Sequence, residues 1–213
     1  MRTKRHIKEK KKFAIVIDGE TEYWYFQMLK RNEKSIAVDI EPKIPQKKKL
    51  SDQYQSVIEL SKNYDKVYWI IDLDVIISES LSVKKGNKRS IDTFLEYKKI
   101  IAKKYKNITL IINQPCLEFW FLVHFEATTQ QFSNCEEAGK KLKKYLPDYE
   151  KSKKYFTKND HDIYIKLKPH LNTAFSNVDK LPLFDSENLN KGTSEMGKFF
   201  EEIQLKKRLS SPK

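Results

Sequence analysis

Five acidic side chains follow two short apolar runs, and their chemistry suits a divalent cation. Three come after the run Phe13–Ile17 and two after Val67–Ile71; in chain order they are Asp18, Glu20, Glu22, Asp72 and Asp74. Carboxylate oxygens are the ligands that Mg²⁺ and Mn²⁺ prefer, and a Mg²⁺ site commonly adds phosphate oxygens of the substrate. Clustered carboxylates repel one another until a cation relieves the repulsion. The pattern predicts one acidic, metal-binding site.

The two apolar runs have the composition of strands that are buried on both faces. A helical pattern at Thr21–Asn32, with Thr21 expected as its cap, follows the first run, and another at Ser51–Tyr64 precedes the second. This rhythm predicts βαβ units and a parallel sheet, whose ligands bind at the carboxyl ends of the strands. We therefore expect the acids to gather at one sheet edge.

Within this site, Asp18 and Glu22 are four residues apart across a glycine turn, so both can face the strand end, and Glu20 is the spare acid. Asp72 and Asp74 point the same way if their strand continues. Each motif also has an ordinary structural explanation. In the first motif, Asp18 is a turn residue, and Glu20 and Glu22 interact favourably with the dipole of the helix that follows. In the second motif, Asp72 and Asp74 simply follow the end of a strand. Either motif alone favours that explanation. Both motifs together, on a basic protein, favour the metal site.

The remaining elements give the fold class. Strands are expected at Ile36–Ile40, stopped by Pro42 and Pro45, and at Ile108–Ile112, with a helix at Ser90–Tyr105 and an exposed loop at Val75–Arg89. Later helices are expected at Leu117–Phe125, Glu136–Leu146, Asp160–Val178, which Pro169 should split or kink, and Asn190–Leu209. The prediction is an α/β fold in which helices flank a parallel sheet of about four strands. It has a basic tail at 1–12, an α/β core at 13–125 and a mostly helical region at 126–213 packed on the core.

A net charge of +13 and a pI of about 9.4 favour a polyanionic partner, nucleic acid before an anionic membrane. Basic clusters interleaved with Tyr145, Tyr149 and Tyr155 suit phosphate contact and base stacking, although a solvated surface explains them almost as well. The candidate nucleic-acid contacts are Lys84, Lys85, Lys88, Arg89, Lys153 and Lys154. Lys153 or Lys154 is also a candidate for stabilising charge in a phosphoryl transition state.

The two cysteines, Cys116 and Cys135, have neither C-x-x-C spacing nor histidines at zinc spacing. This argues against a disulfide framework and a structural zinc site, and it suits a reducing cytoplasm. The amino terminus lacks the apolar core of a signal peptide, and Leu117–Phe125 is too short to span a bilayer. We expect a soluble, cytoplasmic protein with no membrane partner.

Glu118 and His124 are polar residues in an otherwise apolar helical segment, so they need partners if that helix is buried. Glu118 is a candidate to join the metal site. A buried polar pair that satisfies backbone groups is an equally good explanation. His124 alone is more typical of a satisfied core histidine.

These motifs resemble the Toprim domain, in which one strand leads into Glu-Gly and a later strand into Asp-x-Asp. More closely, the chain resembles the RloB-like proteins, found in restriction-modification and phage-defence loci, often beside an ABC-type ATPase. The resemblance rests on D-G-E-T-E-Y-W-Y-F at 18–26, W-I-I-D-L-D at 69–74 and N-Q-P-C-L-E-F-W-F-L-V-H-F at 113–125. Weaker segments are Y-I-K-L at 164–167 and N-K-G-T at 190–193.

The resemblance implies a Mg²⁺- or Mn²⁺-dependent phosphodiesterase, a nuclease that cleaves DNA or RNA as the toxic effector of anti-phage defence by abortive infection. Its implied catalytic residues are Asp18, Glu22, Asp72, Asp74 and Glu118, and its implied metal ligands are Asp18, Glu20, Glu22, Asp72 and Asp74. Two-metal chemistry is compatible with five carboxylates. An ABC-type ATPase is the implied partner protein, and homo-oligomer formation is left open.

Asp18 departs from the Toprim pattern because it stands where that pattern has Glu, and it is one methylene shorter. The alternative function is therefore a non-catalytic nucleic-acid-binding or regulatory subunit with a degenerate Toprim core.

Overall fold

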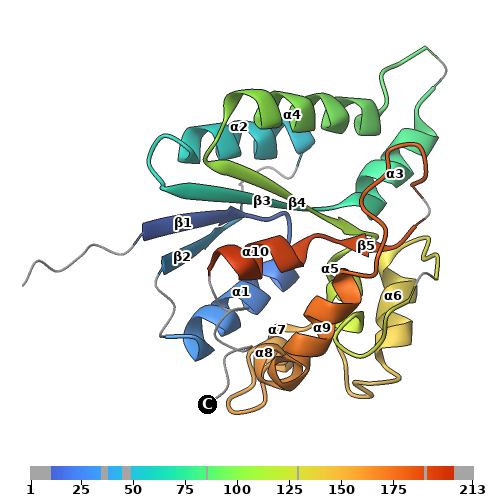
Figure 1. The fold of residues 1–213 in the computed structure, drawn as a ribbon. Coiled ribbons are helices and arrows are strands. Elements are labelled where there is room, and N and C mark those ends of the chain that lie inside the picture. The colour runs from blue at the N-terminus through green and yellow to red at the C-terminus, as the bar shows by residue number, and fades with distance from the viewer. Residues whose placement is uncertain are drawn as a thin grey trace, which may run out of the picture.

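A five-stranded sheet forms the centre of the computed structural model, which describes residues 11–34, 38–44, 49–84, 86–128, 130–189 and 191–203 (Figure 1). The strand order is β2-β1-β3-β4-β5. The strands are β1 (Lys11–Val16), β2 (Val38–Lys43), β3 (Lys66–Asp72), β4 (Ile108–Gln114) and β5 (Thr193–Ser194). The first four strands pair in parallel, and only β5 runs antiparallel, against β4, among the strands described.

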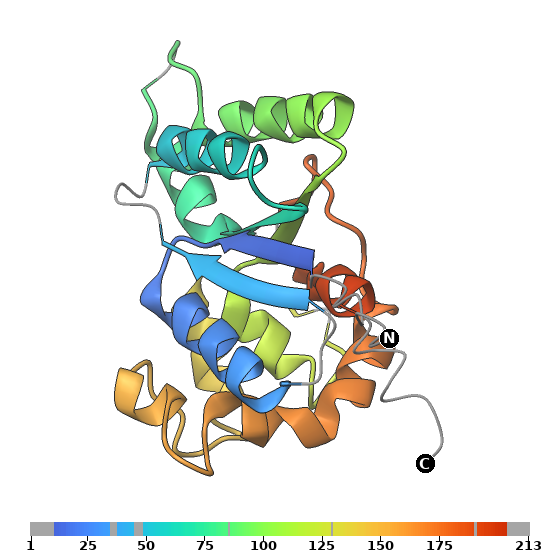
Figure 2. The same cartoon turned by 90° about the vertical axis from the view of Figure 1, so that its left-hand side faces the viewer.

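Both faces of the sheet are covered because its central strands are apolar on both sides. Along β1, Phe13 and Ile15 pack into one hydrophobic cluster, whereas Ala14 and Val16 pack into the other. The helices α2 (Leu50–Leu60) and α4 (Ser90–Lys104) cover one face, and α1 (Glu20–Asn32), α5 (Leu117–Leu122) and α10 (Met196–Glu202) cover the other (Figures 1 and 2). The predicted α/β class with a parallel, helix-flanked sheet is confirmed, and the arrangement is consistent with the Toprim-like description.

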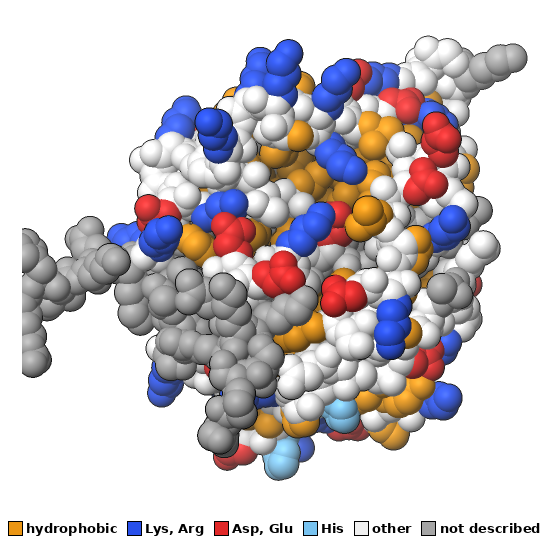
Figure 3. Space-filling model, viewed as in Figure 1, with side chains coloured by type: hydrophobic (Ala, Val, Ile, Leu, Met, Phe, Trp, Pro, Cys, Tyr) orange, Lys and Arg blue, Asp and Glu red, His pale blue; other side chains and the backbone are white. Residues whose placement is uncertain are grey.

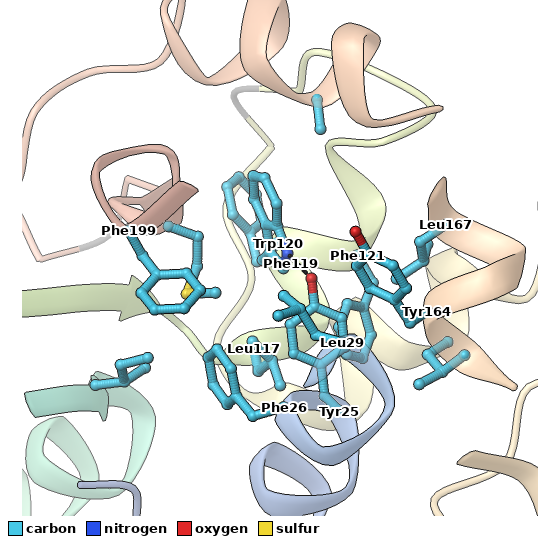
Figure 4. Packing of buried hydrophobic residues seen from close by; sticks show 14 of the residues in the cluster. Tyr25, Phe26, Leu29, Leu117, Phe119, Trp120, Phe121, Tyr164, Leu167 and Phe199 are labelled. Carbon is cyan, nitrogen blue, oxygen red and sulfur yellow. Dashed lines mark hydrogen bonds between the residues drawn. The ribbon is translucent and has the colours of Figure 1, made fainter. Parts of the chain in front are cut away.

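The carboxyl-terminal helices pack around α1 and α5 and build an aromatic core on that face (Figure 4). They are α6 (Cys135–Leu142), α7 (Lys153–Phe156), α8 (Ile163–Leu167) and α9 (Leu171–Val178). Trp120 is fully buried there, donates its indole N–H to the Tyr25 hydroxyl at 2.9 Å and stacks on Phe200 at 5.4 Å. This core links the amino-terminal and carboxyl-terminal parts of the chain.

Replacing Trp120 by alanine is expected to lower the free energy of unfolding by about 3–5 kcal/mol, because a large buried ring leaves a cavity. Urea unfolding followed by circular dichroism measures the change. Leu81→Ala is the control, since Leu81 is 84% exposed and its loss should change stability by less than about 0.5 kcal/mol. A Trp120→Ala loss below about 1 kcal/mol would contradict the packing described for this core.

Three local predictions are corrected. The predicted loop at 75–89 contains a helix, α3 (Leu73–Ser82), because Leu73 and Ile76 are buried at helical spacing. The strand predicted at 36–40 is displaced, since β2 runs through Pro42; proline is tolerated there because β2 is an edge strand. Thr21 does not cap α1, whose N-cap is Gly19.

Other predictions concern the carboxyl-terminal half and the ends of the chain. Pro169 does split its helix: a 3₁₀ turn, η1 (Lys168–His170), separates α8 from α9. The short strand β5 was not predicted. Residues 1–10, most of the predicted tail, lie outside the described residues, as do Ile36, Pro45 and 204–209. Within the described part of the chain, no helix has both the length and the apolar composition needed to cross a bilayer.

Candidate metal centre

Three of the predicted acids converge where two neighbouring parallel strands end. Asp18 follows β1, Glu22 lies in the first turn of α1, and Asp72 ends β3. One carboxylate oxygen from each lies within 4.8 Å of the others. Oxygens that bind one Mg²⁺ at about 2.1 Å lie up to about 4.2 Å apart, so small movements would bring all three onto one ion. We call Asp18, Glu22 and Asp72 the acidic cluster.

Glu22 reaches the cluster because Gly19 leaves room for it. The Glu22 side chain is buried, and a Cβ atom on Gly19 would come closer than 3.0 Å to Glu22 Oε2. The Gly19 backbone is extended, with φ −135°, so this glycine is needed for space rather than for an unusual backbone angle. The Asp-Gly pair thus places one acid and makes room for another.

Asp72 is held by two donors from the next strand and helix. Its Oδ2 accepts the Leu117 backbone N–H at 3.1 Å, and its Oδ1 accepts the Asn113 amide at 3.4 Å. Ser194 of β5 donates to Asn113 Oδ1 at 2.8 Å, which fixes the amide with its NH₂ group toward Asp72. The fifth strand therefore supports the site through Asn113.

Burial, followed by the charges of Glu22 and Asp18, raises the pKa of Asp72 well above the ordinary aspartate value, and the Leu117 N–H opposes the rise. The Asp74 charge adds a smaller increase in the same direction. A proton therefore binds the metal-free site more tightly than it binds a free aspartate. A cation that enters would replace it.

This pKa predicts how pH changes the stability of the metal-free protein. The folded-state pKa of Asp72 is raised. Its contribution to the free energy of unfolding is therefore complete below the unfolded pKa of about 4, and it is lost as the pH rises through the raised folded pKa. Asp72→Asn removes that loss. Between the unfolded and the folded pKa of Asp72, the free energy of unfolding of the variant should therefore rise relative to that of the wild type by up to about 1.4 kcal/mol per pH unit. Denaturant titrations in chelator between pH 4 and pH 8 measure the difference. Parallel curves would contradict it.

Asp74 and Glu20 do not join the three converging oxygens. The two aspartates were expected to point the same way if the strand continued, but β3 ends at Asp72 and α3 begins at Leu73, so that condition is not met. Asp74 instead accepts the backbone N–H groups of Val75 at 2.8 Å and Cys135 at 3.3 Å. Glu20 is exposed at the start of α1.

Glu118 belongs to a second cluster with the two cysteines. It is fully buried, and its Oε2 lies 3.0 Å from Cys116 Sγ and 2.7 Å from Cys135 Sγ. Its Oε1 pairs with the Lys151 ammonium at 2.7 Å and accepts the Tyr149 hydroxyl at 2.8 Å. We call Cys116, Glu118 and Cys135 the sulfur cluster.

Tyr149 lies between the two clusters, and the sequence did not identify this role. Burial raises the pKa of its hydroxyl, and the charges of Glu22 and Asp72 add to the rise, although its hydrogen bond goes to Glu118. Its place among lysines and tyrosines made it resemble a surface aromatic. No local pattern marks it as a buried residue.

The cysteines themselves correct a prediction, because Cys116 and Cys135 form a disulfide. The expectation of no disulfide rested on spacing along the chain. The fold, however, brings the turn after β4 to the start of α6, across 19 residues of sequence.

His124 is fully buried, with its Nδ1 bonded to the Trp120 carbonyl at 2.9 Å. Burial lowers the pKa of His124 to about 3, so it is a neutral core histidine.

The predicted basic contacts divide into separate groups. A cavity of about 390 Å³ beside the acidic cluster is lined by Asp18 and Asp72 and also by Lys49 and Lys88. Lys88 also pairs with Glu96 at 2.5 Å. The other predicted contacts are not part of this lining: Lys84, Arg89, Lys153 and Lys154 are exposed, and Lys85 lies outside the described residues.

Basic side chains form no uniform patch on the face in Figure 3. Lysines and arginines gather at the top of that view, over α2 and α4, and acidic side chains lie among basic ones across its middle. Lys49 was not predicted as a contact, and its position at the N-cap of α2 is what brings it to the cavity.

Comparison with known proteins gives one match. No curated protein and no solved structure matches the chain. A protein-family model described as RloB-like protein matches residues 13–203, a span that runs from β1 to the end of α10 and contains both clusters. The chain belongs to the RloB-like protein family.

Proposed function

We propose that this protein hydrolyses phosphodiester bonds of nucleic acid with Mg²⁺ or Mn²⁺ bound at the acidic cluster. The observation that carries the proposal is the convergence of Asp18, Glu22 and Asp72 at the ends of two neighbouring parallel strands. Like charges in a buried place are costly unless a cation shares the site. The oxygen-only donor set fits these hard cations.

The cation would supply the Lewis acid that polarises a phosphate oxygen and acidifies a water molecule. The protein's own residues set the geometry. Leu117 N–H and Asn113 hold Asp72 in one orientation, and Gly19 lets Glu22 approach. Asp18 and Asp72 belong both to the acidic cluster and to the lining of the neighbouring cavity, so a phosphate bound there would meet the cation.

The cavity supports a phosphate-bearing substrate. Its volume of about 390 Å³ falls within the roughly 300–1,000 Å³ range of ligand sites. Lys49 and Lys88 bring positive charge to a cavity that is also lined by the carboxylates of Asp18, Asp72 and Glu79, and this mixture suits phosphate oxygens next to a cation. The net charge of +13 would add attraction to a polyanion that weakens with salt.

Resemblance to family members from phage-defence loci supports a role as the effector of such a system. The ABC-type ATPase partner, the homo-oligomer and the cytoplasmic location stay predictions.

Incubation of the wild type with end-labelled DNA and RNA in Mg²⁺, Mn²⁺ or chelator tests the proposal. We expect shortened products with either cation and none with chelator. Binding without cleavage of any substrate in either cation would contradict the nuclease and support the non-catalytic alternative, which the shorter Asp18 side chain favours.

A further inference from the structure

The disulfide lies where the starts of α5 and α6 meet, close to the acids Asp72 and Asp74 at the end of β3. Cys116 is the N-cap of α5 and is 1% exposed, whereas Cys135 is the first residue of α6 and is half-buried. The bond therefore joins the turn after β4 to the start of α6. It fixes two backbone segments that approach the acidic strand ends.

The polar groups around the sulfur atoms also suit the reduced form. Glu118 Oε2 faces both sulfurs, at 3.0 and 2.7 Å, yet a disulfide has no proton to donate to a carboxylate, whereas a thiol has one. The Lys151 ammonium lies 3.1 Å from Cys135 Sγ, where it would stabilise a thiolate. After reduction, each sulfur would therefore have a polar neighbour: the Glu118 carboxylate could accept a thiol proton, and the Lys151 ammonium could stabilise a thiolate at Cys135.

Cys135 is the sulfur that a small reagent can reach. A cavity of about 370 Å³ is lined by Cys135, Glu118, Tyr149 and Lys151, and Cys116 is not part of that lining. Thiol–disulfide exchange needs access for in-line attack on one sulfur. The attacked atom would be Cys135 Sγ, and Cys116 would be the leaving thiolate.

The bond also connects to the acidic strand ends through two backbone donors. The amide of Leu117, the residue after Cys116, donates to Asp72 at 3.1 Å. The amide of Cys135 donates to Asp74 at 3.3 Å. Both donors are in, or next to, a bonded cysteine, so opening the bond frees the segments that carry them.

We propose that Cys116 and Cys135 are a reversible redox pair, exchanged by dithiols and their disulfides, that sets how firmly the acidic strand ends are held. A reductant thiolate attacks Cys135 Sγ, the Cys116–Cys135 bond breaks, and Cys116 leaves as a thiolate that takes up a proton. The second reductant thiol then displaces Cys135. In balance, protein disulfide plus dithiol gives protein dithiol plus cyclic disulfide. The proposal extends beyond the nuclease function, and only its effect on cleavage would depend on that function.

Thiol counting tests the exchange. The folded, full-length protein is equilibrated in mixtures of reduced and oxidised dithiothreitol, alkylated with iodoacetamide and weighed by mass spectrometry. We expect one transition from no alkylated cysteine to two, reached from both directions. Two free thiols at every ratio, or a bond that opens only when the protein unfolds, would overturn the proposal.

Hydrogen exchange tests the coupling, without metal or nucleic acid. Amide protons of Leu117 and Cys135 should exchange at least about tenfold faster after reduction, whereas those of α4 should not change. Cys135→Ser should match the reduced wild type under oxidising conditions, and if that variant does not fold, the reduced wild type gives the same reading. Equal exchange in both redox states would overturn the coupling. If the protein did not cleave nucleic acid, the thiol-counting and hydrogen-exchange results would still stand. The redox proposal and the nuclease proposal are therefore tested independently.

Discussion

Asp72→Ala should lower the rate of metal-dependent nucleic-acid cleavage by at least about 100-fold. Loss of a group that only supports a metal ligand already costs about 10–100-fold, and Asp72 is itself a member of the acidic cluster, held by the Asn113 amide and the Leu117 N–H. The change also removes a buried charge among like charges, so the variant should remain folded. Cleavage rates at saturating Mn²⁺, together with thermal melting, measure both effects.

Glu20→Ala is the matched control for this prediction. Glu20 is an acid from the same D-G-E-T-E motif, but it is exposed and does not belong to the acidic cluster. Its removal should change the cleavage rate by less than about twofold. If Glu20→Ala abolished cleavage while Asp72→Ala retained it, the assignment of the ligands would be wrong.

Gly19→Ala should weaken Mn²⁺ binding by about 10–100-fold while the fold is retained. The new Cβ would come closer than 3.0 Å to Glu22 Oε2, so the Glu22 carboxylate must leave its position in the cluster. Alanine tolerates the extended backbone of this position, so the effect should fall on binding rather than on folding. Isothermal titration with Mn²⁺ measures the affinity.

Gly139→Ala is the matched control: it makes the same chemical change at a position where Mn²⁺ binding should not be affected. A Cβ there would meet Tyr149 Cε1 at an ordinary 3.8 Å, and the site is inside α6. We expect unchanged Mn²⁺ affinity and a gain of about 0.5–1 kcal/mol in the free energy of unfolding. Equal Mn²⁺ affinity in the two variants would show that Glu22 is not a ligand.

The sheet and the position of the acids could be predicted because they follow local rules. A continuous apolar run that ends in an acid indicates a buried parallel strand, and the carboxyl ends of β1 and β3 must share one edge. Sequence alone therefore narrowed 29 acidic residues to five candidate ligands, and the structure brings three of these together, Asp18, Glu22 and Asp72. It also placed the break at Pro169, because proline blocks a continuous helix.

The other features depend on contacts between distant parts of the chain. The neighbour of Glu118 is Cys135, 17 residues away, and α5 and α6 must pack before the two can meet. Asp74 does not follow the predicted strand alternation because the strand ends at Asp72, two residues before Asp74, and α3 begins at Leu73. Support of Asn113 by Ser194 spans 81 residues, and no local pattern predicts such a pair.

Anomalous diffraction from crystals soaked in Mn²⁺ tests the binding of a cation by the acidic cluster most directly. We expect a peak bonded at about 2.0–2.3 Å to oxygens of Asp72 and of Glu22 or Asp18. An ordered cluster with no peak at millimolar Mn²⁺, or a peak only among Cys116, Glu118 and Cys135, would contradict the assignment.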